Sequence, residues 1–374
     1  MDLSALERDA DIAAARGDFA VALNLLARAT QTDPGHFTLW LKRAAMCRAT
    51  GDPRATLAAI ERALAFQPLD FTALLMRATQ LEATGNVDKA GEAFGRAIAQ
   101  APATMAPLLG PIIVNAKLKF RAWQDKQAAA MRAAVPVLSD ALERMITNAV
   151  HLTTPDREGP THYCYPGLPE IPFHDRAHFP WLATLEAATA SISAEFESVA
   201  AAHAAELVPY IQYPENVPLE QWRTLNQNRD WTAIHLIERG RVVDANARYC
   251  PQLMQLLGSV PQPNITGAGP NAMFSLLAPN THIPPHTGIT NTRLVCHLPL
   301  IVPPGCWFHV GDVRQIWVPG QAWVFDDTIE HEAMNPSDAL RVILIVDLWH
   351  PDLDAQDRDG VAAVIGAGGG VHGL

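Results

Sequence analysis

The chain has 374 residues, of which 49% are hydrophobic and 18% charged, a composition typical of a folded protein with room for two or more domains. The net charge of −11, without a cluster of lysine and arginine, argues against nucleic acid or an anionic membrane surface as the main partner. No window of about 20 residues is continuously apolar, so we expect no transmembrane helix. The five cysteines lack CxxC spacing, and we expect a protein of the reducing cytoplasm.

The first third of the chain repeats with a period of 34 residues. Glycine recurs at 17, 51 and 85, proline at 34, 68 and 102, and alanine at 10, 44 and 78. A small residue lets two helices approach closely, glycine makes the turn between them, and proline ends the second helix. Residues 1–103 therefore predict three helical hairpins in a short solenoid, and they resemble tetratricopeptide repeats. The resemblance implies a concave groove for a peptide or protein segment, or alternatively a purely structural or dimerising platform.

The remainder predicts a second, β-rich domain. Residues 104–160 keep helical periodicity and then become rich in proline, which indicates capping and linker helices. From 272 onward, short apolar runs are separated by turns, with no helix between them. Residues 161–355 therefore predict, after one helix over 181–203, a jelly roll (double-stranded β-helix) with a pocket at one end. We expect the glycine-rich segment 356–374 to be a flexible tail.

Two histidines of this domain are candidate metal ligands. His286 lies in the loop before one predicted strand, and His331 follows another. Two imidazoles from neighbouring strands suit Fe(II) when they leave positions open for a bidentate co-substrate and dioxygen. Arg341 begins a buried-looking strand, where a guanidinium is costly unless it meets an anion such as a dicarboxylate or a protein carboxylate. Asp326, Asp327 or Asp347, which lie nearby in the sequence, could serve as that protein carboxylate.

Several segments within residues 230–353 resemble the aspartyl/asparaginyl β-hydroxylase family of Fe(II)- and 2-oxoglutarate-dependent oxygenases. They are HTGITNTRL, HLPL, VFDD, EHEAMN and VDLWHPDL. The resemblance implies that His286 and His331 hold the iron, and that Gly288 stands where related oxygenases place a carboxylate. It also implies that Arg341, helped by Ser275, binds the distal carboxylate of 2-oxoglutarate.

The same resemblance gives roles to further residues. His297 would approach the carboxylate of 2-oxoglutarate that lies nearer the metal, and Trp231 would line the co-substrate site. Arg293 matches a family position at the start of the strand that follows His286. One residue departs from the family pattern: Val295 stands where the family usually has an arginine that helps to bind an acidic group. This departure predicts weaker co-substrate binding or a different substrate.

The resemblance predicts an Fe(II)- and 2-oxoglutarate-dependent dioxygenase that uses O2 to hydroxylate an unactivated carbon. The expected carbon is the β-carbon of an aspartyl or asparaginyl residue in a peptide or protein recruited by the repeats. One alternative is a scaffold protein with repeats and a degenerate oxygenase domain. Another is a metal-dependent cupin that would recruit His282, His297 and Glu330 as additional ligands. Nothing in the sequence specifies an oligomeric state.

Overall fold

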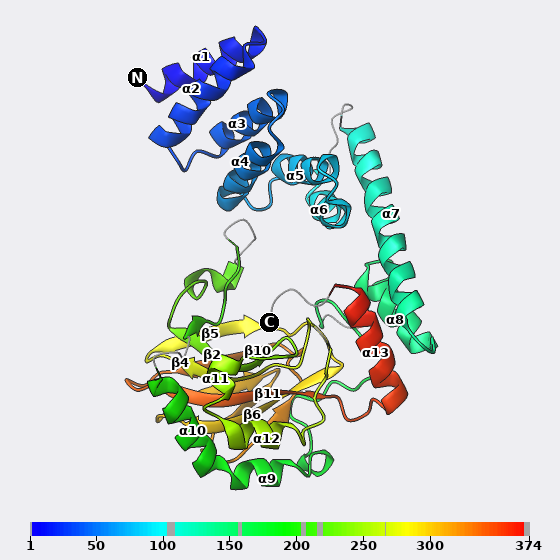
Figure 1. Cartoon of the computed structure of the whole chain (residues 1–374), viewed down its shortest axis with the longest axis vertical. Coiled ribbons are helices and arrows are strands. Elements are labelled where there is room, and N and C mark those ends of the chain that lie inside the picture. The colour runs from blue at the N-terminus through cyan, green and yellow to red at the C-terminus, as the bar shows by residue number, and fades with distance from the viewer. Residues whose placement is uncertain are drawn as a thin grey trace. The chain divides into compact units, whose positions relative to one another are not determined.

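The computed structural model describes residues 2–102, 109–155, 159–202, 207–214, 220–265 and 267–369. They form two compact units, which divide at residue 126 (Figure 1). The fold is mixed: the first unit is helical, and the second contains two antiparallel sheets. None of the helices among these residues is long and apolar enough to span a bilayer.

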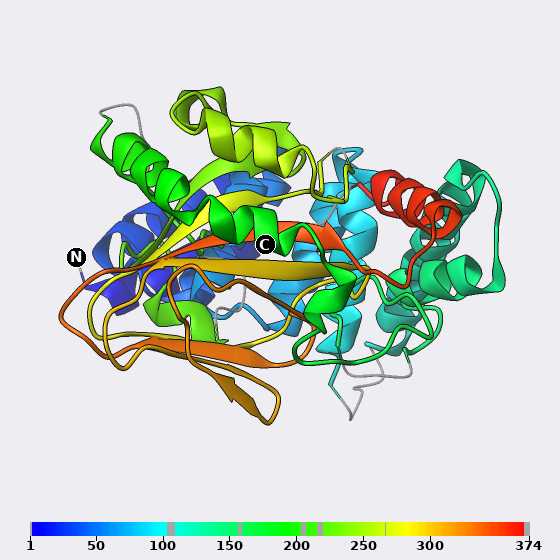
Figure 2. The same cartoon turned by 90° about the horizontal axis from the view of Figure 1, so that it is seen from below.

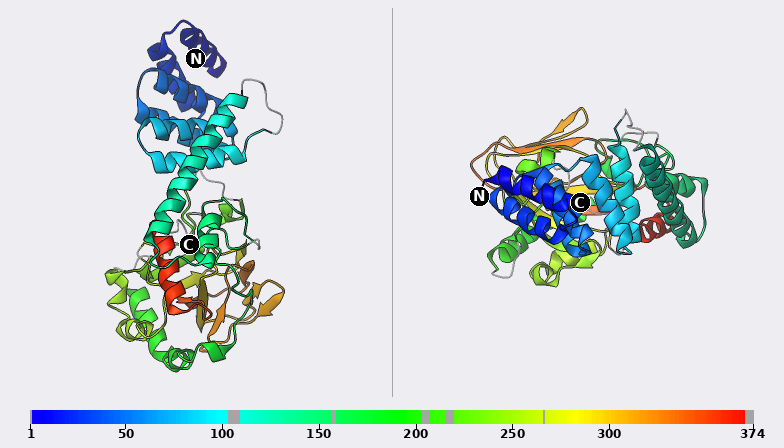
Figure 3. Two further views of the ribbon diagram at one scale, coloured as in Figure 1. Left: turned by 90° about the vertical axis from the view of Figure 1, so that its right-hand side faces the viewer. Right: turned by 90° about the horizontal axis from the view of Figure 1, so that it is seen from above.

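The first unit consists of helical hairpins that follow the 34-residue period (Figure 3). Its first six helices are α1 (Leu3–Ala15), α2 (Phe19–Thr32), α3 (Phe37–Ala49), α4 (Pro53–Phe66), α5 (Phe71–Ala83) and α6 (Val87–Ala99). The recurring glycine of each hairpin turn has a positive φ, between 77° and 83°, which side chains rarely adopt. The recurring alanine is at most 1% exposed in each repeat, as close helix packing requires. The three predicted hairpins are therefore present.

The long helix α7 (Gly110–Ala134) begins in the first unit and covers its last hairpin. Phe120 and Trp123 stack at 5.7 Å and lie against two glycines of α6. A Cβ atom added at Gly91 would lie 2.1 Å from the Trp123 ring, and one added at Gly95 would lie 2.5 Å from Phe120. The absence of side chains at these two positions therefore allows α7 to close the repeat array.

The second unit contains a large sheet with the strand order β1-β2-β4-β11-β6-β9, in which β3 also pairs with β2. These strands are β1 (Val208–Pro209), β2 (Trp231–Glu238), β3 (Arg241–Val242), β4 (Ala272–Leu277), β6 (Arg293–Ile301), β9 (Trp323–Phe325) and β11 (Arg341–Trp349). The small sheet has the order β5-β10-β7-β8 and contains β5 (Thr281–His286), β7 (Trp307–Val310), β8 (Val313–Gln315) and β10 (His331–Asn335).

Strand alternation gives the large sheet two different apolar faces. Helices cover one face, and the small sheet lies over the other (Figure 2). On β11, Leu344 and Val346 pack against the helices that cover one face, whereas Ile343 and Ile345 face the small sheet. The covering helices are α9 (Leu182–Ala187), α10 (Thr189–Ala201) and α12 (Pro251–Leu257), and the short α11 (Asp244–Ala247) lies beside β2. The predicted single helix over 181–203 is thus divided in two at Ala188.

The predicted flexible tail is wrong over residues 356–367, which belong to helix α13 (Ala355–Ala367). Asp354 caps this helix by accepting a hydrogen bond from the amide of Asp357 at 2.8 Å. Val361 and Val364 are fully buried in a cluster with α8 (Asp140–Ala149). A Cβ at Gly360 would lie 2.4 Å from Leu142, so a glycine that indicated flexibility instead permits close packing. Residues 370–374 lie outside the described ranges.

We predict that Gly91→Ala lowers the stability of the repeat unit, although alanine favours helix more than glycine does. The added methyl overlaps Trp123, and overpacking of this kind costs about 1–3 kcal/mol. Thermal unfolding of the full chain, followed by circular dichroism at the helical band, measures the loss. Gly110→Ala is the control, because a Cβ there meets no atom within 4 Å. Equal melting curves for the two variants would contradict this packing.

Candidate active site

A cavity of about 450 Å³ in the second unit is lined by strands of both sheets. Every residue to which the hydroxylase resemblance gave a metal or co-substrate role lines it. These residues are Trp231, Ser275, His286, Arg293, His297, His331 and Arg341. They come from β2, β4, β5, β6, β10 and β11, so the fold brings together residues that are up to 110 positions apart in the chain.

The two candidate metal ligands face each other across one strand pair. His286 is the last residue of β5 and His331 the first of β10, rather than loop residues as predicted, and the two are register partners. Their ring centroids are 4.0 Å apart. The Nδ1 atoms lie 2.8 Å from the Pro284 carbonyl oxygen and 2.9 Å from that of Ile329, respectively. This arrangement leaves the Nε2 atom of each ring available to a metal.

Burial keeps both imidazoles neutral. It lowers the pKa of His286 to about 4. It also lowers the pKa of His331 well below its ordinary value, and the neighbouring His286 adds to this effect. The neutral imidazole is the form that binds a metal ion. The pair therefore fits a divalent transition metal held by two protein ligands.

Position 288 has no room for a carboxylate. A Cβ added at Gly288 would lie 2.5 Å from the carboxylate of Asp327, whose backbone carbonyl accepts a hydrogen bond from the Gly288 amide at 2.6 Å. Asp327 is itself held by an ion pair with Arg293. Burial raises the pKa of Asp327 to about 7, although the charge of Arg293 opposes this rise. The carboxylate of Asp327 therefore leaves room only for glycine at position 288.

Among the residues that the structure describes, Arg341 provides a buried positive charge without a carboxylate counter-ion. The residue is 2% exposed, and its guanidinium lies 5.2 Å from the centre of the Trp317 ring. Within the described residues, its Nε and Nη2 atoms have no hydrogen-bond partner. Burial lowers its pKa to about 10. Because such a group is costly when unpaired, the cavity favours an anionic ligand at Arg341.

The carboxylates expected as alternative partners of Arg341 are engaged elsewhere. Arg293 pairs with Asp327 and, at 3.0 Å, with Asp347. The side chain of Asp326 accepts hydrogen bonds from the amide and hydroxyl of Thr328. The suggestion that one of them neutralises Arg341 is therefore wrong, because the aspartates that line the cavity are ordered around a different arginine.

Polar groups beside Arg341 extend its anion-binding surface. On β4, Ser275 accepts a hydrogen bond from the Trp231 indole nitrogen at 3.0 Å. On β6, His297 accepts one from the Trp317 indole at 3.4 Å, and burial together with Arg341 lowers its pKa to about 3. Both His297 and Ser275 therefore present neutral groups to the same cavity.

An aromatic wall was not predicted. Tyr210 stacks on Trp231 at 3.8 Å with an interplanar angle of 6°, and Trp222 lies 4.9 Å from the His286 ring. Tyr210 follows the short strand β1, and Trp222 belongs to a single 3₁₀ turn (Glu220–Thr224), so neither has a periodic sequence pattern. The only available signal was the concentration of aromatic residues before β2.

The additional ligands of a cupin site are not assembled. The Nε2 atom of His282 lies 2.9 Å from a carboxylate oxygen of Glu332, and the His282 side chain is 45% exposed. Neither His282 nor Glu330 lines the cavity. Within the ranges that the structure describes, no cluster of three or more histidine, cysteine, aspartate or glutamate side chains is arranged to hold a metal.

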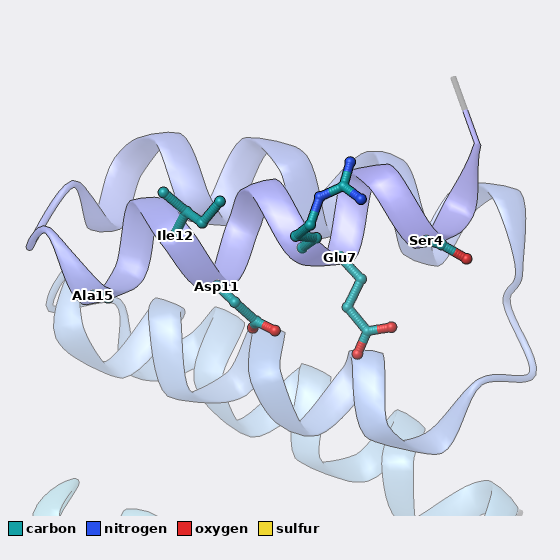
Figure 4. A pocket seen from close by; sticks show the side chains of 6 residues that line it. Ser4, Glu7, Asp11, Ile12 and Ala15 are labelled. Atoms are coloured by element: carbon teal, nitrogen blue, oxygen red, sulfur yellow. The ribbon is translucent and has the colours of Figure 1, made fainter.

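A second, shallow depression lies on α1 of the first unit (Figure 4). Glu7 and Asp11 of α1 share the ammonium group of Lys42 on α3, at 2.8 and 2.7 Å. Ile12 and Ala15 add apolar surface beside them. The depression therefore combines two partly neutralised carboxylates with a small apolar patch.

The family model for aspartyl/asparaginyl beta-hydroxylase matches residues 187–351. The human aspartate beta-hydroxylase domain-containing protein 2 is 33% identical over 220 residues, which are 57% of each chain. The human aspartyl/asparaginyl beta-hydroxylase is 34% identical over 147 residues, 39% of this chain and 19% of that protein. The ornithine lipid ester-linked acyl 2-hydroxylase of Rhizobium tropici is 34% identical over 190 residues, 50% of this chain and 63% of that protein.

The two sheets and the histidine pair lie within the segment that is similar to these hydroxylases. Residues 187–351 match the model of the aspartyl/asparaginyl β-hydroxylase family, and the chain is 33–34% identical to these relatives over the aligned segments. Its match spans about half the length of the first of these relatives.

We predict that Gly288→Ala destabilises the second unit by about 1–3 kcal/mol, because the added methyl displaces Asp327 from Arg293. Urea unfolding followed by tryptophan fluorescence measures this loss, since only Trp40 and Trp123 of the nine tryptophans belong to the first unit. Gly366→Ala, where a Cβ meets no atom within 4 Å, is the control. Unchanged stability of Gly288→Ala would show that Asp327 moves freely.

Proposed function

We propose that the chain is an Fe(II)- and 2-oxoglutarate-dependent dioxygenase. In this proposal it hydroxylates an unactivated carbon, the β-carbon of an aspartyl or asparaginyl residue, in a peptide or protein substrate. The observation that supports it is one cavity that holds two neutral imidazoles and a buried guanidinium without a counter-ion. The imidazoles suit a ferrous ion with open positions, and the guanidinium suits a carboxylate.

His286 and His331 would hold the iron. With 2-oxoglutarate and O2, the bound iron supplies the oxidant that places one oxygen atom in a C–H bond while 2-oxoglutarate becomes succinate and CO2. The protein fixes the orientation of both ligands through the carbonyls of Pro284 and Ile329. This fixed orientation maintains the metal-binding tautomer before any metal arrives.

Arg341 would bind the distal carboxylate of 2-oxoglutarate. Its free Nε and Nη2 atoms offer two donors, and Ser275, held by Trp231, adds a hydroxyl. His297 would approach the carboxylate nearer the metal as a neutral imidazole. The apolar surroundings exclude water from these groups, which strengthens each charge-assisted hydrogen bond.

The helical hairpins would recruit the substrate. Their surface includes the depression on α1, where carboxylates and apolar side chains lie together. Such a surface suits an extended peptide segment better than a small metabolite. The peptide character of the substrate rests on this unit, whereas the oxidation chemistry rests on the cavity of the second unit.

Arg341→Ala is expected to weaken 2-oxoglutarate binding by about 10- to 100-fold, the loss of one charge-assisted ion pair. Calorimetric titration without oxygen, with Mn(II) in place of iron, measures the affinity. Arg314→Ala is the control, because Arg314 lies over Trp307 and does not line the cavity. Equal binding by both variants would remove Arg341 from the co-substrate site.

His331→Ala is expected to abolish Fe(II)-dependent conversion of 2-oxoglutarate to succinate, since one imidazole cannot hold the ion in place. Succinate is quantified with the wild type and with His309→Ala, whose imidazole lies outside the cavity. If the wild-type chain neither binds nor converts 2-oxoglutarate in the presence of metal, the protein is a non-catalytic repeat scaffold.

A further inference from the structure

Three successive inward-facing residues of β6 determine the charge of one cavity wall. Arg293, Val295 and His297 alternate along the strand and all line the cavity. Arg293 is engaged by two carboxylates, Asp327 and Asp347, and His297 is neutral. This wall therefore has no uncompensated positive charge.

Two atoms of the same wall lack hydrogen-bond partners. Within the described residues, Asp327 Oδ1 and Arg293 Nε are buried and unpaired, whereas both oxygens of Asp347 are occupied, by Arg293 and Asn271. Asp327 Oδ1 requires a donor and Arg293 Nε requires an acceptor. A buried polar atom without a partner costs about 1–3 kcal/mol, which a ligand of matching polarity recovers.

Arg341 is the other guanidinium of the cavity, and 2-oxoglutarate uses it under the function proposed above. Among the described residues that line the cavity, a substrate carboxylate would consequently find no further unpaired guanidinium or ammonium group. It would meet Val295, whose register partner is the aromatic Phe325, and the carboxylate of Asp327. Asp327 and Asp347 already share the guanidinium of Arg293, so a third carboxylate beside them has no cation to pair with and is disfavoured as the wrong substrate.

We propose that the substrate presents an uncharged amide side chain, that of asparagine, and that Val295, Asp327 and Arg293 reject the isosteric carboxylate of aspartate. The amide N–H donates to Asp327 Oδ1, and the amide oxygen accepts from Arg293 Nε. A carboxylate has no donor for Asp327. This inference rests on the proposed function and narrows its substrate to one of two side chains of nearly equal shape.

The chemical step is balanced by the co-substrate. The substrate C–H bond breaks and a C–O bond forms with one atom of O2, while the other atom enters succinate. Two electrons come from the C–H bond and two from the decarboxylation of 2-oxoglutarate, which releases CO2. The amide itself is unchanged, so its role is to position the adjacent carbon.

The test uses a library of peptides in pairs that differ only by asparagine or aspartate at one central position. Each pair is incubated with the full chain, Fe(II), 2-oxoglutarate and air, and hydroxylation is read as a mass gain of about 16 Da. We expect kcat/KM for asparagine peptides to exceed that for their aspartate partners by at least about tenfold. Equal or faster reaction of aspartate peptides would overturn the inference.

Substitution of Val295 in the cavity wall gives a second test. Val295→Arg supplies the missing cation and is expected to reverse or abolish the preference, whereas Val295→Leu remains neutral and preserves it. If the wild type, Val295→Arg and Val295→Leu all prefer asparagine peptides, Val295 does not determine the choice between asparagine and aspartate. Circular dichroism of each variant establishes folding, and the wild-type comparison stands even if Val295→Arg does not fold.

Parallel measurement of succinate distinguishes failure of the asparagine preference from failure of the proposed oxygenase activity. If 2-oxoglutarate is converted but no asparagine peptide is hydroxylated, the amide inference fails and the oxygenase proposal survives. If wild-type protein with Fe(II) produces no succinate under any condition, the oxygenase proposal itself fails.

Discussion

The antiparallel pairing of β5 with β10 is the constraint on which the candidate site depends. This register brings His286 opposite His331. It shifts between His331 and Ala333, an irregularity of the kind that redirects side chains beside active sites. A different pairing register would separate the two rings, because side chains alternate between faces along a strand. The geometry of the histidine pair is therefore a property of the sheet rather than of a flexible loop.

The cavity combines charges in two different ways. Arg293 is surrounded by carboxylates and forms a local network, which orders the wall without attracting a further anion. Arg341 has no such partner and keeps its charge at a cost in solvation. The cavity therefore has an uncompensated positive charge at Arg341 and a wall along β6 whose guanidinium is balanced by carboxylates.

The sequence predicted most of what depends on periodicity or on specific motifs. The 34-residue period located the helical hairpins, because each hairpin needs the same glycine and alanine at the same positions. The spacing of His286, His331 and Arg341 identified three residues that share one cavity. Both kinds of signal can be read along the chain, because the fold requires particular residues at fixed spacings.

Features that depend on tertiary contacts were missed. Strand β2 is almost entirely buried and therefore shows no polar alternation, and α13 is rich in glycine. The aromatic wall comes from short loops without a period. The pairing of Arg293 with Asp347 joins residues 54 positions apart, whereas proximity in the sequence had suggested Asp347 as one alternative partner of Arg341.

Strand β11 lies between β4 and β6 in the large sheet, and all nine of its residues are buried. Its backbone amides are therefore protected on both edges and both faces, and they should exchange with deuterium only when the whole second unit opens. Arg341 begins this strand, so the guanidinium is attached to a segment that we expect to exchange slowly. Local fluctuations that open the aromatic wall would leave this anchor in place.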